Sequence, residues 1–183
     1  METYQMDDEQ KWYHIILTTY GAWLPGDPRG FRTRHHRQHV EGDYRNPPPK
    51  EKYEKLETHS KKSIKHPPII LSPELRSVVG KALHNRLNET NVSVACLSVG
   101  GQHIHLLVKM PIGQTRNVIG NAKRHAWFVL REKGWINKLW GKRAKSIPIR
   151  DRPHQINVYN YIIEHQNEGA WVWKHSDGND KSN

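Results

Sequence analysis

Two histidines separated by a single residue, His103 and His105, form the densest cluster of potentially reactive side chains in this sequence. Residues two apart in a β-strand point to the same face, so both imidazoles would lie side by side while Ile104 points the other way. Such a pair can chelate a divalent metal ion. The alternative is a structural or solvent-facing pair, so the spacing alone does not define a site.

Two enzyme classes that use this spacing are excluded. A histidine-triad nucleotide hydrolase needs a third histidine where Leu107 stands, and a two-histidine phosphoesterase needs a second motif of this kind. Neither condition is met. A third ligand and a nucleophile must therefore come from elsewhere.

Tyr161 and His165 can supply both roles, because residues four apart share one face of a helix and could face a single metal site. In the alternative interpretation, Tyr159 and Tyr161 are packing residues and His165 interacts with the helix dipole.

The elements that must position these side chains follow from apolar periodicity and from capping residues. Ser72, followed by Pro73 and Glu74, is typical of a helix N-terminus. Glycines at 100–101 predict the turn of a hairpin. We expect strands at 12–19, 92–99 and 103–109, one or two more strands within 135–149, and helices at about 53–59, 72–88, 116–133 and 155–166.

This order predicts an α+β fold: a ferredoxin-like antiparallel sheet with helices on one face, plus a C-terminal helix that carries the tyrosine. One domain spanning 1–183 is expected from the length. A long basic insertion at about 29–68, which has too few apolar residues to fold independently, and a polar tail at about 175–183 lie outside the expected core.

Positive charge is concentrated in two segments. Residues 29–66 hold 11 basic and 5 acidic residues, residues 116–152 hold 11 and 2, and the formal net charge is +11. Separated basic segments suit a phosphate backbone. An anionic membrane is the weaker alternative, because neither segment has a clean apolar face.

A cytoplasmic protein is expected. The single cysteine, Cys96, lies in an apolar run and cannot form an internal disulfide. The acidic, polar start of the chain is no signal peptide, and no apolar run approaches the ~20 residues that span a bilayer.

Together these features resemble the HUH single-tyrosine transposases, which include insertion-sequence transposases and REP-associated tyrosine transposases. That family has a His-hydrophobic-His pair on a central strand, matched by His103-Ile104-His105. Its catalytic tyrosine opens a Tyr-Ile-x-x-Gln or Tyr-Ile-x-x-Asn motif on a late helix, matched by Tyr161 and Ile162. The resemblance covers two short motifs and the order of the elements.

The sequence departs from this pattern at the third ligand. His165 occupies the usual glutamine or asparagine position, and Gln166 follows as the alternative ligand. His165 is favoured because position i+4 shares the face of Tyr161, whereas i+5 is rotated away. Tyr159 is a second-choice nucleophile, because its i+4 neighbour, Ile163, cannot bind a metal.

The resemblance implies an enzyme that binds hairpin and single-stranded DNA, forms a 5′-phosphotyrosine link through Tyr161, and later rejoins the strand. It also implies Mg²⁺ or Mn²⁺ on His103, His105 and His165, a homodimer, and a place in the bacterial cytoplasm or nucleoid. A three-histidine set favours Mn²⁺ and admits Zn²⁺. Phosphate contacts are expected from Lys123, Arg124, Lys142, Arg143 and Lys145.

Five tryptophans could stack unpaired bases, although tryptophans more often belong to the core: Trp127, Trp135, Trp140, Trp171 and Trp173. Two other classes of function remain open. A non-catalytic, nucleic-acid-binding relative would keep its function in Tyr161→Phe, and a metal-dependent nuclease using activated water would keep its cleavage.

Overall fold

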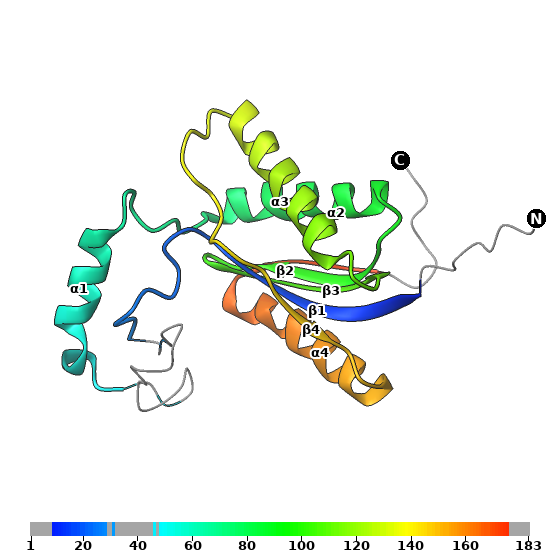
Figure 1. The fold of residues 1–183 in the computed structure, drawn as a ribbon, viewed down its shortest axis with the longest axis horizontal. Helices are drawn as coiled ribbons and strands as arrows, with labels where there is room; N and C mark the ends of the chain where they lie inside the picture. The colour runs from blue at the N-terminus through cyan, green and yellow to red at the C-terminus, as the bar shows by residue number, and fades with distance from the viewer. Residues whose placement is uncertain (1–8, 29–30, 32–45, 47, 176–183) are drawn as a thin grey trace, which may run out of the picture.

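A five-stranded antiparallel sheet forms the centre of the computed structural model, which describes residues 9–28, 31, 46 and 48–175 (Figure 1). The strand order is β4-β1-β3-β2-β5. Its members are β1 (Gln10–Thr18), β2 (Ser93–Val99), β3 (His103–Pro111), β4 (Lys145–Pro148) and β5 (Trp171–Lys174). The first four strands have the ferredoxin-like order, and the predicted α+β fold class is confirmed.

Helices cover both faces of this sheet (Figure 1). Helices α2 (Pro73–Glu89) and α3 (Thr115–Glu132) pack on one face, where alternate strand residues such as Ile15, Leu17 and Ile104 are fully buried. Helix α4 (Arg152–Glu164) lies on the other face over a smaller cluster that includes Cys96 and Leu107. The tyrosine helix is thus separated from α2 and α3 by the sheet.

Side-chain caps fix where the helices begin. The amide of Leu75 donates to Ser72 Oγ at 3.4 Å, so α2 begins as the sequence predicts. Asp151 caps α4 by accepting from the amide of His154 at 2.8 Å. Helix α4 therefore begins three residues before the predicted position of 155, and a short 3-10 helix, η2 (His165–Glu168), continues it.

Only the second half of the predicted insertion can be compared with the structure. The predicted short helix at 53–59 corresponds to α1 (Glu54–Ser63), which follows a single 3-10 turn, η1 (Lys50–Lys52). Most of residues 29–47, and tail residues 176–183, lie outside the described residues. Within the described part of the chain, no helix is long and apolar enough to cross a membrane.

Strand β5 was not predicted from the sequence. It pairs antiparallel with β2, and its Trp171 packs so tightly on α2 that a Cβ added to Gly80 would overlap the indole ring. Gly80 is therefore selected by contact with Trp171, although glycine disfavours a helix interior.

Gly80→Ala is expected to lower the free energy of unfolding by about 1–2 kcal/mol, because the overlap outweighs the gain in helix propensity. The control is Gly120→Ala in α3, where an added Cβ meets nothing within 4 Å and stability should rise by up to about 1 kcal/mol. Urea unfolding of both variants measures whether each substitution lowers or raises the free energy of unfolding. A stabilised Gly80→Ala protein would contradict the packing.

Candidate functional site

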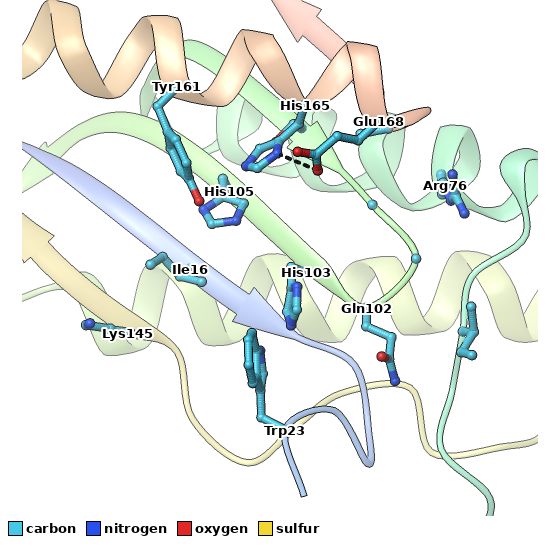
Figure 2. Close-up of a pocket in the computed structure, with 15 residues that line it drawn as sticks. Ile16, Trp23, Arg76, Gln102, His103, His105, Lys145, Tyr161, His165 and Glu168 are labelled. Atoms are coloured by element: carbon cyan, nitrogen blue, oxygen red, sulfur yellow. Dashed lines mark hydrogen bonds and ion pairs between the residues drawn. The ribbon is translucent and has the colours of Figure 1, made fainter. Parts of the chain in front are cut away.

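A pocket of about 840 Å³ lies between α4 and the sheet, on the face that α2 and α3 leave open (Figure 2). Three separate segments bring chemically reactive side chains to it. Strand β3 contributes His103 and His105, helix α4 with its η2 continuation contributes Tyr161 and His165, and strand β4 contributes Lys145.

The two β3 histidines enter the pocket from the same strand face, as their spacing predicts, but they make different contacts. His105 is 8% exposed and lies under Tyr161, with ring centroids 5.4 Å apart and ring planes at 90°. His103 stacks on Trp23, with centroids 4.9 Å apart and planes at 25°. In Figure 2 the His103 ring accordingly points toward Trp23, whereas Tyr161 points toward His105.

The α4 pair is placed as the helical spacing predicts. Tyr161 in the last turn of α4 and His165 at the start of η2 point to the same side, with ring centroids 4.7 Å apart. His165 also stacks over His105, with centroids 4.8 Å apart and planes at 28°. Tyr161 is 39% exposed, so its ring can be reached by a substrate while its inner side faces the imidazoles of His105, His165 and, at 6.0 Å between centroids, His14.

Each of the two central imidazoles is held through its Nδ1 atom. Nδ1 of His105 and Nε2 of His14 share a hydrogen bond of 3.0 Å whose donor depends on the tautomers. Nδ1 of His165 is 3.3 Å from Oε2 of Glu168. Within the described residues, the buried Nε2 of His165 has no hydrogen-bond partner. That nitrogen is available to an incoming proton, ligand or metal.

His14 is a site residue that the sequence analysis missed. It lies on β1, where Tyr13, Ile15 and Leu17 belong to the main core, so strand periodicity already placed His14 on the opposite face of the sheet. No short spacing connects it to His105, because the two are 91 residues apart and meet only through pairing of β1 with β3.

Burial keeps both members of this histidine pair neutral. Burial, with smaller contributions from His165, His14 and His103, lowers the pKa of His105 to about 3. Burial, followed by the charges of His154, Lys145 and His165, lowers the pKa of His14 to about 4. At neutral pH both rings therefore stay uncharged, and the lone pair of one of them accepts the hydrogen bond that joins the pair. If Nδ1 of His105 is the donor, its Nε2 keeps a lone pair that can bind a metal.

These pKa values predict acid sensitivity. Unfolded histidine has a pKa near 6.5, so the unfolded state binds more protons than the folded state between pH 6.5 and about 4. The free energy of unfolding should be at its full value above pH 6.5 and should fall as the pH drops, by roughly 3 kcal/mol for His14 alone.

Melting temperatures between pH 7 and 4 test this prediction. The decrease in melting temperature from pH 7 to pH 4 should be smaller in His14→Gln than in wild type. It should equal the wild-type decrease in the control His59→Gln, which changes an exposed residue of α1. Parallel curves for wild type and His14→Gln would contradict the effect assigned to the buried pair.

The side chains present fit a metal ion only in part. The unpartnered Nε2 of His165 beside the neutral His105 suits a cation. The described residues nevertheless contain no group of three or more His, Cys, Asp or Glu side chains arranged to hold a metal ion. His103, one of the two predicted ligands from β3, has its ring stacked on Trp23.

The other candidate residues from α4 and η2 lie outside the pocket lining. Gln166, the alternative third ligand, is exposed on η2. Tyr159, the second-choice nucleophile, packs against the core cluster beneath α4. Tyr161 is thus the described tyrosine that lines the pocket.

The predicted DNA contacts fall on both faces of the sheet. Lys145 lines the pocket, and Lys142 and Arg143 are exposed on the segment before it. Lys123 and Arg124 belong to α3, across the sheet from Tyr161. Lys123 is half-buried there and donates to the Gly141 carbonyl at 3.0 Å, and burial lowers the pKa of its ammonium group.

The five tryptophans considered for base stacking have structural contacts. The indole N–H groups of Trp127 and Trp135 donate to the carbonyl of Asn137, and that of Trp140 donates to the carbonyl of Lys123. Trp171 and Trp173 pack on α2. The tryptophan that lines the pocket is Trp23, which the sequence analysis did not select.

Comparison with known proteins gives limited similarity. No family model and no curated protein matches the chain. Among solved structures, a REP-associated tyrosine transposase bound to a REP hairpin is similar at 12% identity and a TM-score of 0.48, over 92% of this chain and 74% of that one. A candidate transposase from Deinococcus radiodurans R1 is similar at 13% identity and a TM-score of 0.43, over 91% and 98%.

Proposed function

We propose that this protein is a DNA transposase that cleaves one strand of hairpin or single-stranded DNA through a 5′-phosphotyrosine intermediate and then rejoins it. The observation that carries the proposal is the cluster of Tyr161, His105 and His165 in one pocket, with ring centroids no more than 5.4 Å apart. The resemblance of the two motifs to single-tyrosine transposases supports the same assignment.

The pocket can activate tyrosine. A phenol has a reference pKa of ~10, so it needs a proton acceptor to attack near neutral pH. The ring of His165 lies beside Tyr161, and its buried Nε2, which has no hydrogen-bond partner among the described residues, is the proposed acceptor of that proton. Lys145, in the same pocket, places positive charge where a phosphate would enter.

The proposed reaction conserves the phosphodiester energy. The Tyr161 oxygen forms a bond to phosphorus, the bond from phosphorus to the 3′ oxygen breaks, and that oxygen takes a proton to become a 3′-OH. A 3′-OH of another strand can later attack the phosphotyrosine, releasing Tyr161 and sealing the DNA. No nucleotide hydrolysis is needed in either step.

A divalent metal, Mg²⁺ or Mn²⁺, is part of the proposal as a Lewis acid that would withdraw charge from the phosphate oxygens. His105 and His165 are its proposed ligands, with His103 as the third once its ring leaves Trp23. With a metal on the rings of His105 and His165, these rings would orient Tyr161, and the positive charge of the ion would favour loss of the phenol proton in place of a histidine acceptor. A homodimer and a cytoplasmic location stay predictions.

The bound strand is expected to run along the basic segment beside the pocket. Lys142→Ala/Arg143→Ala should weaken hairpin binding and reduce the slope of log affinity against log salt by about 1.5, because two phosphate contacts are lost. The charge-matched control Lys81→Ala/Lys133→Ala, on the α2 and α3 side of the sheet, should keep the wild-type slope. Equal slopes for both double variants would place the DNA elsewhere.

Incubation with Mn²⁺ and labelled single-stranded hairpins from the flanks of the gene tests the proposed function directly. A denaturing gel should show a covalent protein–DNA band and a released strand with a free 3′-OH. Cleavage without a covalent band would favour a nuclease that uses activated water. Hairpin binding without cleavage at any tested site would favour a non-catalytic binding protein.

A further inference from the structure

Trp23 differs from the other tryptophans in its surroundings. Its side chain lines the pocket and is 38% exposed. Trp12 packs against the core under α4, and the remaining five make the packing or hydrogen-bond contacts given above. A large, flat aromatic surface is thus present at the same pocket as Tyr161.

The backbone at Trp23 is held in an unfavourable conformation. Its φ angle is +56°, in the left-handed region that bulky side chains rarely occupy. The preceding turn is tied down on both sides, because the amide of Tyr20 donates to the carbonyl of Leu139 and Thr19 Oγ1 donates to the carbonyl of Ile69 at 2.6 Å. Strain of this kind that surrounding contacts maintain is typical of functional sites.

The same turn places the indole beside β3, the strand that carries His103 and His105. Thr18 pairs with His103, and the amide of Thr19 donates to the carbonyl of Gln102 at 3.0 Å, so the turn is joined to the start of β3. Trp23 then lies face to face with His103 (Figure 2). The indole therefore contacts His103, the neighbour of His105 on this strand face, and His105 in turn contacts Tyr161.

We infer that Trp23 is the stacking surface for an unpaired nucleobase next to the cleaved phosphate, an inference that rests on the proposed function. A nucleotide offers the two features that this part of the pocket can recognise: a flat aromatic base for Trp23 and an anionic phosphate for Lys145. Stacking on an aromatic side chain requires an unpaired base, which agrees with a single strand rather than a duplex.

Two variants separate stacking from folding. Trp23→Asn removes the aromatic ring, and asparagine tolerates a positive φ better than most residues, so the turn should remain intact. Trp23→Phe keeps a smaller stacking ring. Both are made in a Tyr161→Phe background, so that binding is measured without cleavage, and the probe is a hairpin with 2-aminopurine placed at each unpaired position in turn.

The chain with Trp23 should quench 2-aminopurine at one or two adjacent positions, because the fluorescent base is stacked there. Trp23→Asn should remove this quenching and raise the Kd by about ten-fold or more, and Trp23→Phe should retain most of both effects. An abasic nucleotide at the quenched position should weaken binding of the Trp23 chain but change binding of Trp23→Asn by less than two-fold.

Unchanged quenching and affinity in Trp23→Asn would overturn the inference. Covalent adduct formation, measured separately in chains that keep Tyr161, reports on the proposed function. If Trp23-dependent quenching occurs without any adduct, the stacking role stands and the transposase proposal fails. If the adduct forms and Trp23→Asn changes neither quenching nor affinity, the transposase proposal stands and the stacking role fails.

Discussion

Tyr161→Phe is expected to abolish the covalent protein–DNA adduct and to reduce strand cleavage by more than about a thousand-fold. The change removes one oxygen atom, the proposed nucleophile, and leaves the ring in contact with His105 and His165. Affinity for the hairpin should stay within about two-fold of wild type. The measurement is a time course of adduct and cleaved strand on denaturing gels.

The matched control is Tyr159→Phe, which removes the same atom two residues earlier on α4. Tyr159 packs against the core cluster under the helix and does not line the pocket, so its variant should cleave at nearly the wild-type rate. Wild-type cleavage in Tyr161→Phe would mean that water, not tyrosine, attacks the phosphate. Loss of activity in both variants would indicate a damaged helix instead.

His105→Ala is expected to give the second largest loss, about a hundred-fold to a thousand-fold in the cleavage rate. His105 is buried below Tyr161, stacks with His165 and shares a hydrogen bond with His14, so its removal disturbs both the proton acceptor and the proposed metal ligand set. Hairpin binding should persist, because burial lowers the pKa of His105 to about 3 and its removal takes away no positive charge at neutral pH. Rates are measured well below the melting temperature, because a buried ring is replaced by a small one.

Comparison with His103→Ala separates the two roles of His105. Titration of Mn²⁺, followed by electron paramagnetic resonance of the free ion, should show weaker binding in both variants if the metal uses both histidines. If His103 remains stacked on Trp23, only His105→Ala should change Mn²⁺ binding. The control is His125→Ala on α3, across the sheet. Full cleavage activity in His105→Ala would contradict the proposed site.

Helix caps and apolar periodicity predicted most of the helices and strands, because these elements are determined by interactions between residues close in the sequence. Ser72 caps α2 with its own side chain, and the two-residue period of a strand fixes which residues of β1 and β3 share a face. Strand β5 was missed because it has only four residues and follows a helix without a clear pattern. The face covered by α4 could not be derived either, because it depends on packing of Val158 and Ile162 beneath the sheet.

For the candidate site too, residues close together in the sequence could be predicted, whereas residues brought together only by folding could not. Pairs related by strand or helix spacing, His103 with His105 and Tyr161 with His165, could be found in the sequence, and the structure places all four at one pocket. His14 and Trp23 could not. His14 meets His105 only because β1 pairs with β3, and Trp23 contacts His103 from the turn that follows β1. The stacking of His103 on Trp23 could not be predicted from residue spacing either.

Mass spectrometry of the nuclease-trimmed protein–DNA adduct tests the central claim most directly. Tyr159 and Tyr161 are close enough to share a peptide, so fragmentation of that peptide must distinguish them. The proposed mechanism predicts a nucleotide attached through its 5′ phosphate to Tyr161. Attachment to any other residue, or complete cleavage with no attached nucleotide at any time point, would contradict it.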